Sequence, residues 1–136
     1  MTPFHLAFAI DEIEATRDFY HRVLGCALGR EAPNWIDFDF FGHQISGHVN
    51  TDARSPATTE VAGEQVPLHH FGVVLPWAQW NELIARLRAE NWAFLLEPHI
   101  RFENEPGEQG TFFIKDPSGN ALEFKSFKNG LGLFDR

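Results

Sequence analysis

Two stretches of the chain share one alternating pattern of small and large side chains. Residues 5–10 read His-Leu-Ala-Phe-Ala-Ile and residues 70–75 read His-Phe-Gly-Val-Val-Leu. A period of two is typical of a β-strand with one face against a core. Each predicted strand therefore places its large residues on one face and turns the histidine, with its small neighbours, to the other face.

A helical pattern follows each of these strands. In the first half, Asp11 has the side chain of a helix N-cap, and Gly25 suits the residue after the last turn. The positions at helical spacing are Ile13, Arg17, Tyr20 and Leu24 in the first half and Trp80, Leu83, Ile84 and Leu87 in the second. Each half therefore begins with a strand and a helix.

Each half then ends in the pattern of a hairpin. The first has alternating segments at 35–41 and 44–49 around Gly42, and the second has segments at 111–115 and 121–127 around Asp-Pro-Ser-Gly-Asn. A short strand is expected around 93–96. Residues 97–110 contain two prolines and two glycines, and are predicted to form a long loop that could act as a lid.

This order of elements predicts one α+β domain over residues 1–136. We place a first module at about 1–49, a connection at 50–66, a second module at 67–128 and a C-terminal tail after it. With 43% hydrophobic residues, including 14 Phe, the chain has enough apolar material to fill a core.

Composition narrows the class of function. The net charge is −8, and no run of Lys or Arg reverses it locally, which disfavours nucleic-acid binding. Cys26 is the only cysteine, so an intrachain disulfide and a cysteine-rich zinc site are excluded. We find no signal-peptide pattern and no apolar stretch of about 18 residues. We therefore expect a cytoplasmic protein that contacts no membrane.

Three side chains that can bind a metal share one predicted face. His5 and His70 open the two related strands, and Glu123 alternates with Leu122 and Phe124 in the last strand. Imidazole nitrogens and a carboxylate suit a divalent first-row metal. A histidine at a strand start is more often a structural residue, and a strand carboxylate is usually solvated. The coincidence of all three on one face favours a metal site.

Other polar residues share this face or lie near it. His48 is a candidate fourth ligand or acid–base residue, and an exposed histidine with neither role is an equal alternative. His43 lies in the turn, and His69 has the opposite parity to His70, so both are weaker candidates. The candidate substrate-binding residues are Asp37, Asp39, Ser46, Phe113, Lys115 and Arg101, the last in the predicted lid beside His99.

The repeated His-strands and the segment Asp-Pro-Ser-Gly-Asn-Ala-Leu-Glu-Phe at 116–124 resemble the vicinal oxygen chelate superfamily. This superfamily includes glyoxalase I, bleomycin- and fosfomycin-resistance proteins and extradiol dioxygenases. Segments 3–8, 39–44 and 106–109 resemble a group of small bacterial proteins described as predicted extradiol-type dioxygenases. The resemblance implies two βαβββ modules forming a cup around a metal held by His5, His70 and Glu123. It also implies a homodimer or pairing of the modules within one chain.

One departure from the family pattern bears on activity. Glyoxalase I enzymes carry a further carboxylate on the strand that corresponds to 44–49, and the alignment of Gly42 with Gly119 places Ser46 opposite Glu123. The resemblance therefore implies a dioxygenase-like enzyme, with Fe(II) favoured and Mn, Ni or Zn acceptable, acting on a small molecule with vicinal oxygens. The alternatives are a lyase or transferase of the glyoxalase or fosfomycin-resistance kind, and a metal-free binding protein.

Overall fold

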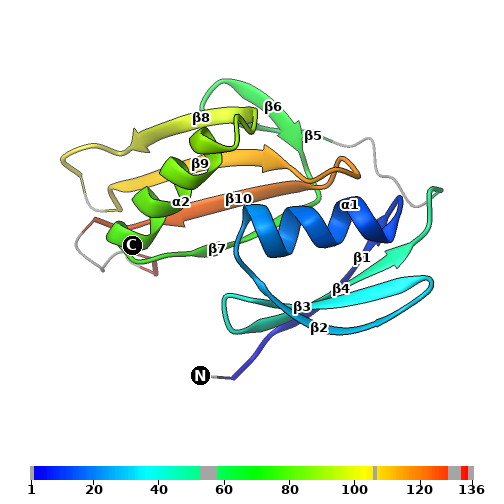
Figure 1. The fold of residues 1–136 in the computed structure, drawn as a ribbon. Coiled ribbons are helices and arrows are strands. Elements are labelled where there is room, and N and C mark those ends of the chain that lie inside the picture. Colours follow the sequence, from blue (N-terminus) through cyan, green and yellow to red (C-terminus); the bar gives the residue numbers. More distant parts are fainter. Residues whose placement is uncertain (1, 53–57, 106, 129–132, 135–136) are drawn as a thin grey trace. The chain divides into compact units, whose positions relative to one another are not determined.

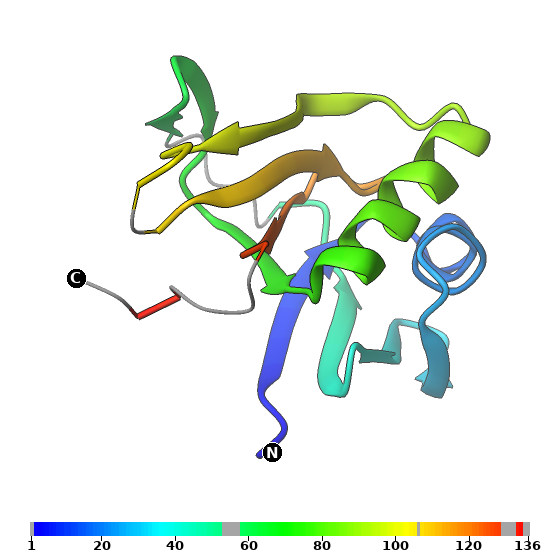
Figure 2. The ribbon, with the colours of Figure 1, turned by 90° about the vertical axis from the view of Figure 1, so that its left-hand side faces the viewer.

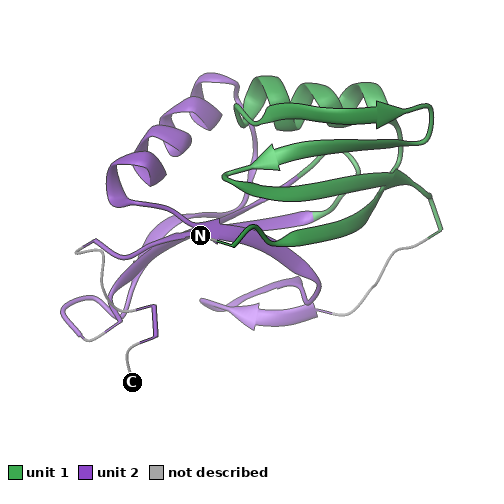
Figure 3. Ribbon diagram, turned by 90° about the horizontal axis from the view of Figure 1, so that it is seen from below, with its two compact units in different colours: residues 1–55, 116–120 green, residues 56–115, 121–136 purple. Residues whose placement is uncertain are grey.

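The computed structural model describes residues 2–52, 58–105, 107–128 and 133–134. These residues fall into two compact units, which are described separately (Figure 3). Unit 1 comprises residues 1–55 and 116–120, and unit 2 comprises residues 56–115 and 121–136. Within the described residues, no helix has the length and apolar character needed to cross a membrane.

Unit 1 is a four-stranded sheet with a helix. Its elements are β1 (His5–Ile10), α1 (Ile13–Arg17), the π-helical turn η1 (Asp18–Val23), β2 (Ala27–Ala32), β3 (Trp35–Phe40) and β4 (His43–Val49). The strand order is β1-β4-β3-β2 (Figure 1). The first strand pairs in parallel with the last, and the other neighbours pair antiparallel.

Unit 2 repeats this arrangement. Its elements are β5 (Thr58–Val61), β6 (Glu64–Pro67), β7 (His70–Val74), α2 (Trp77–Ala89), β8 (Phe94–Arg101), β9 (Gln109–Lys115) and β10 (Ala121–Ser126). The main sheet has the order β7-β10-β9-β8, with β7 parallel to β10, and β5 and β6 form a separate hairpin (Figures 1 and 2). The repeat predicted from the sequence is therefore a repeat of topology.

Of the large residues in the two repeated strand patterns, Ile10 and Leu75 are buried, and Leu6, Phe8, Phe71 and Val73 are half-buried, so much of each core comes from the helices and the other strands. In unit 1, Tyr20 is fully buried and its ring lies 4.9 Å from that of Phe38. In unit 2, the indole N–H of Trp80 donates to the carbonyl of Phe124 at 2.9 Å, and its ring lies 5.8 Å from that of Phe112. Each helix thus covers the face that carries the large side chains, leaving the histidine face of each sheet on the other side.

The start of the first helix differs from the sequence prediction. Glu12, rather than Asp11, is the N-cap, and its side chain accepts the backbone N–H of Ala15 at 2.6 Å. The backbone N–H of Asp11 instead donates to Ser118 Oγ at 2.8 Å. The predicted end is confirmed: Gly25 follows the C-cap with φ +81°, a conformation that glycine adopts without strain.

The long loop predicted at 97–110 is largely wrong. Strand β8 continues to Arg101 and β9 begins at Gln109, which leaves residues 102–108 between them. Pro98 lies where the β8–β9 register shifts, between the pairs at Leu96 and His99. A bulge tolerates a residue without a backbone N–H, so this proline does not end the strand. Arg101 therefore lies in a strand and not in a lid.

Two further segments lacked a readable strand pattern. Strand β2 is almost entirely exposed, so it carries no apolar alternation from which it could be predicted. The β5–β6 hairpin, except for its last residue Pro67, lies within the segment 50–66 that was expected to be a plain connection, and of its residues only Val66 is buried. Strands that bury little apolar surface are specified mainly by their partners.

The predicted turn at 116–120 is built around a buried carboxylate. Asp116 accepts four hydrogen bonds of 2.8–2.9 Å, from the backbone N–H groups of Ser118 and Asn120, the Asn120 amide and the Tyr20 hydroxyl. The Asn120 amide also donates to the carbonyl of Ala9 at 2.8 Å. Burial raises the pKa of Asp116 above its ordinary value, although all four hydrogen bonds act to lower it.

We expect Tyr20→Phe to destabilise the protein by about 1.5–3 kcal/mol at neutral pH, because it removes a hydrogen bond to a buried charged group. The Tyr20 hydroxyl lowers the pKa of Asp116, so this substitution should raise that pKa further. Because burial raises the pKa of Asp116 in the folded state, the free energy of unfolding falls as the pH rises through this pKa. The Tyr20 hydrogen bond stabilises the ionised carboxylate and so reduces this fall. The destabilisation should therefore be larger at about pH 7 than at about pH 4 in urea unfolding. An equal loss at both values would contradict this account.

Candidate metal centre and ligand pocket

His70 and Glu123 come together in unit 2. They lie on the adjacent parallel strands β7 and β10, and His70 Nε2 is 3.4 Å from Glu123 Oε1. Their side chains are 23% and 10% exposed, so the pair is largely shielded but still reachable from solvent. The pairing follows from the strand register, which sets Ala121 beside His70 and Gly72 beside Glu123.

The imidazole of His70 has a defined orientation. Its Nδ1 lies 2.8 Å from the carbonyl oxygen of Pro67, a contact that requires the proton on Nδ1. In the neutral ring Nε2 is then an acceptor, and it faces a carboxylate oxygen. Two acceptors that face each other are stabilised by a cation between them. A histidine bound to a metal commonly holds its other N–H on a backbone carbonyl in this way.

The two oxygens of Glu123 have different partners. Thr111, which is fully buried, donates its hydroxyl to Oε2 at 2.7 Å. Oε1 faces His70 and lies 4.0 Å from Lys125 Nζ. The carboxylate is therefore held by one oxygen and presents the other. Thr111 was missed by sequence reasoning, although it shares the alternation of Phe113 and Lys115.

Phe113 and Gly72 shape the surroundings of the pair. The ring of Phe113 is fully buried and meets the His70 ring edge-on at 5.0 Å between centroids. A Cβ atom at position 72 would overlap the backbone carbonyl of Glu123. Glycine at this position therefore permits the close approach of β7 to β10, a backbone role in addition to leaving room beside the histidine.

The third predicted ligand, His5, belongs to unit 1. It is exposed at the start of β1, where its register partner on β4 is Gln44. Across the parts of the chain that the structure describes, no group of three or more His, Cys, Asp and Glu side chains is gathered as a metal would need. Of the predicted ligand set, the structure brings together His70 and Glu123.

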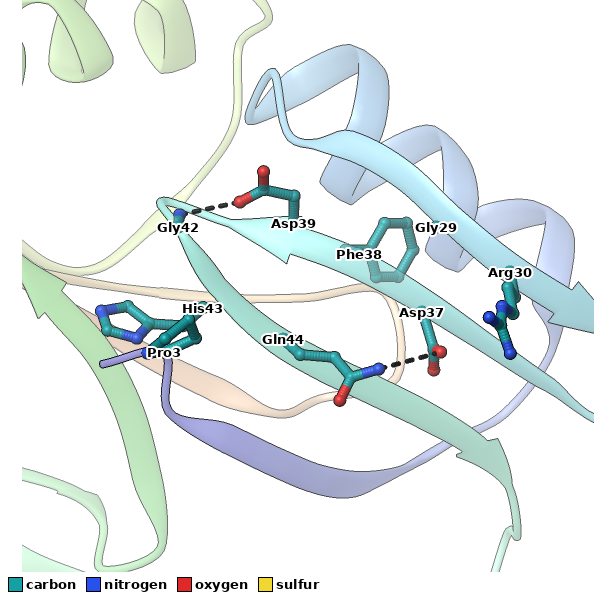
Figure 4. Close-up of a pocket in the computed structure, with 9 residues that line it drawn as sticks. All are labelled: Pro3, Gly29, Arg30, Asp37, Phe38, Asp39, Gly42, His43 and Gln44. Carbon is teal, nitrogen blue, oxygen red and sulfur yellow. Dashed lines mark hydrogen bonds between the residues drawn. The ribbon is translucent and has the colours of Figure 1, made fainter. Parts of the chain in front are cut away.

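Unit 1 carries a pocket of about 500 Å³ on its own sheet (Figure 4). The lining residues are Pro3, Gly29, Arg30, Asp37, Phe38, Asp39, Gly42, His43 and Gln44. Asp37 accepts hydrogen bonds from Ser46 Oγ at 2.6 Å and from the Gln44 amide at 3.3 Å, and Asp39 accepts the backbone N–H of Gly42 at 2.7 Å. The carboxylates are thus held in place by their neighbours.

Three of the pocket residues that were not expected from the sequence have polar side chains, namely His43, Gln44 and Arg30. His43 was assigned to the turn, but its Nδ1 accepts the backbone N–H of Phe4 at 2.8 Å and its ring lines the pocket. Gln44 lies two residues before Ser46 in the same strand and therefore shares its face, so the sequence could have predicted it. The sequence could not have predicted Arg30, because this residue lies on β2, a strand that the sequence pattern did not predict.

The remaining predicted residues lie on strands. Ser46 is buried beneath Asp37, and His48 is exposed on β4, with register partners Ala9 and Trp35. Lys115 is exposed at the end of β9. The Arg101 guanidinium stacks over the ring of Phe102, 5.0 Å from its centroid.

The registers of the two sheets make Ser46 the counterpart of Glu123. Ser46 pairs with Ala7, two residues after His5, and Glu123 pairs with Gly72, two residues after His70. Unit 1 therefore has a hydroxyl where unit 2 has a carboxylate. In unit 1 the nearest carboxylate to this position is that of Asp37, which lies on the neighbouring strand β3 as the antiparallel partner of Ser46.

Comparisons with known proteins agree with this fold. A family model described as the glyoxalase/bleomycin resistance protein/dioxygenase superfamily matches residues 2–124. The chain belongs to this superfamily, and its α+β fold is the one expected. No curated protein matches it.

Several solved structures are similar to the chain. A glyoxalase/bleomycin resistance protein/dioxygenase from Alicyclobacillus acidocaldarius is 32% identical, with a TM-score of 0.78, and the match covers 98% of this chain and 92% of that one. The fosfomycin resistance protein FosX from Listeria monocytogenes is 12% identical, with a TM-score of 0.72 and coverage of 96% and 98%. Lactoylglutathione lyase from Agrobacterium tumefaciens is 16% identical, with a TM-score of 0.64 and coverage of 92% of each chain. The last two similarities concern the fold alone.

Replacing Thr111 with Val should destabilise the protein by about 1.5–3 kcal/mol, because one oxygen of the nearly buried Glu123 carboxylate loses its hydroxyl donor. Thr111→Ser keeps the donor and should retain most of the stability. Urea unfolding of both variants measures the difference. A valine variant as stable as the wild type would mean that the hydroxyl does not hold the carboxylate.

Proposed function

We propose that this chain is a metal-dependent enzyme of the superfamily that acts on a small molecule with vicinal oxygens by dioxygenase-like chemistry. The proposed ligands are His5, His70 and Glu123, and the favoured metal is Fe(II), with Mn, Ni or Zn as substitutes. The observation that carries the proposal is the 3.4 Å approach of His70 Nε2 to Glu123 Oε1, with the imidazole proton on the opposite nitrogen.

The donor pair fits a first-row divalent ion. Such ions bind imidazole nitrogen and carboxylate oxygen at about 2.0–2.2 Å, so two ligands of one ion are separated by about 3.0–3.4 Å. The observed 3.4 Å separation is compatible with this range. Thr111 supports the fit, because it holds Glu123 by the oxygen that does not face His70.

Two imidazoles and one carboxylate leave coordination positions at which a chelating substrate and O₂ can meet. In this proposal Phe113 limits the access of water to His70, and His48 transfers protons. The residues proposed to contact the substrate are Asp37, Asp39, Ser46, Phe113, Lys115 and Arg101. We also propose a homodimer, which sedimentation analysis would test.

A second candidate, from the lyase or transferase alternatives, is a metal-assisted lyase reaction of the glyoxalase kind, and Asp37 is the observation that favours it. This reaction class uses a carboxylate base beside the metal, which the position of Ser46 lacks. The Asp37 carboxylate is hydrogen-bonded to Ser46 at 2.6 Å, so a carboxylate lies one strand from the expected position. Asp37→Asn should abolish turnover if Asp37 is that base, and should mainly raise KM if Asp37 only contacts the substrate.

Metal content is the decisive measurement. Protein purified without oxygen should contain about one divalent transition metal per chain, by elemental analysis. His70→Ala and Glu123→Gln should weaken metal binding by more than the roughly 10–100-fold that loss of a supporting partner causes. His21→Ala is the matched control, because His21 is an exposed histidine whose Nδ1 contacts the carbonyl of Cys26.

The outcomes separate the classes of function. Bound iron with catechol-dependent O₂ uptake would support the dioxygenase, and a bound metal with lyase turnover alone would support the second candidate. Wild-type protein that contains no metal under these conditions, and takes up none, would overturn both. Ligand binding that survives His5→Ala and His70→Ala would then identify a metal-free binding protein.

A further inference from the structure

One face of the unit 2 sheet gathers positive charge. Cross-strand partners share a face, as do residues two apart in a strand. The register pairs Ala121 with His70 and Lys115, Lys125 with Thr111, Thr111 with His99 and Arg101 with Gln109. Three basic residues, Lys115, Lys125 and Arg101, therefore lie on this face. Among the described residues of these strands, Glu123 is the one carboxylate on the same face. The chain as a whole has a charge of −8, so this face opposes the average.

Lys125, on the interior strand β10, is the cation of this face that lies against Glu123. Its Nζ lies 4.0 Å from Glu123 Oε1, the same oxygen that His70 Nε2 approaches to 3.4 Å. The other oxygen of Glu123 is occupied by the Thr111 hydroxyl at 2.7 Å. The negative charge of one oxygen, Glu123 Oε1, would therefore have to balance both the Lys125 ammonium group and a metal bound by Glu123.

When a metal is bound, Lys125 would therefore need another negatively charged partner. A cation held by His70 and Glu123 would take most of the negative charge at Oε1, and its own charge would repel the ammonium group. The side chain of Lys125 is 37% exposed, so it can be reached by a ligand from solvent. An anionic group on the ligand would restore the balance of charge beside the metal-binding pair.

We propose that the ligand of this centre carries an oxyanion, such as a carboxylate, that binds Lys125 next to the oxygens that chelate the metal. This inference rests on the proposed function and specifies its substrate class as anionic. Lys115 and Arg101 on the same face add to the field that attracts such a molecule. Binding should therefore weaken as ionic strength rises.

The first experiment compares two ligands that differ by one carboxylate, 3,4-dihydroxybenzoate and catechol, by calorimetry on metal-loaded protein without oxygen. Lys125→Met should weaken binding of 3,4-dihydroxybenzoate about tenfold, a difference of 1.4 kcal/mol. Binding of catechol should be unchanged. Lys125→Arg keeps the charge and should retain most of the affinity. Lys128→Met is the matched control, since Lys128 is exposed outside the sheet and its loss changes net charge equally.

Two results of this experiment would overturn the proposal. The first is unchanged binding of 3,4-dihydroxybenzoate to Lys125→Met. The second is an equal loss for catechol, which would mean that the lysine acts on the fold or the metal. Metal content of each variant is measured alongside, so that loss of the metal is recognised directly.

The second experiment does not depend on a metal. Metal-free Glu123→Gln protein, in which the charge next to Lys125 is removed as a bound metal would neutralise it, is titrated with benzoate and with benzamide, its uncharged analogue, and the backbone amide signals are followed by NMR. Benzoate should shift the amides of Thr111 and Lys125 in Glu123→Gln but not in the double variant that also carries Lys125→Met, and benzamide should shift neither. If elemental analysis finds no metal but benzoate shifts these amides, the oxyanion site is supported and the proposed metal-dependent enzyme is not. Equal shifts with benzoate and benzamide would overturn the oxyanion site.

Discussion

The parallel pairing of the first and last strands of each four-stranded sheet, β1 with β4 and β7 with β10, is the constraint on which the rest of that sheet depends. Parallel strands cannot be joined by a tight turn, so the chain between them must cross over, and here a helix and two antiparallel strands make that crossing. In unit 2 the pairing is close enough that Gly72 has no space for a side chain against the Glu123 backbone. The same closeness places His70 beside Glu123. The proposed metal-binding pair is thus a direct product of strand register.

The buried carboxylate of Asp116 shapes the turn that precedes the last strand. Removing it from water opposes its ionisation, and the hydrogen bonds from the turn and from Tyr20 offset that cost. Such a network has few alternative arrangements that satisfy every donor. It therefore holds the turn at 116–120, which directly precedes β10 in the chain.

The two units use one topology with different chemistry at corresponding positions. Unit 2 presents a carboxylate on its last strand, oriented by Thr111 and flanked by His70 and Lys125. Unit 1 presents Ser46 at the same register and keeps its carboxylate, Asp37, on the next strand. A shift of one strand moves a side chain by almost 5 Å, which separates the proposed metal ligand Glu123 from Asp37, a residue proposed to contact substrate.

The sequence by itself determined the features that depend on local periodicity. The period-two alternation marked β1 and β7 and assigned their faces, and the Asp-Pro-Ser-Gly-Asn turn was recognisable from its residues. Local pattern failed at two places: the helix cap is Glu12 rather than Asp11, whose backbone N–H binds the distant Ser118, and β8 continues through Pro98 at a bulge in its pairing with β9. Only the tertiary structure decided that Thr111 holds Glu123 and that Lys125 shares its free oxygen. Those contacts are set by cross-strand register, a quantity that no single strand contains.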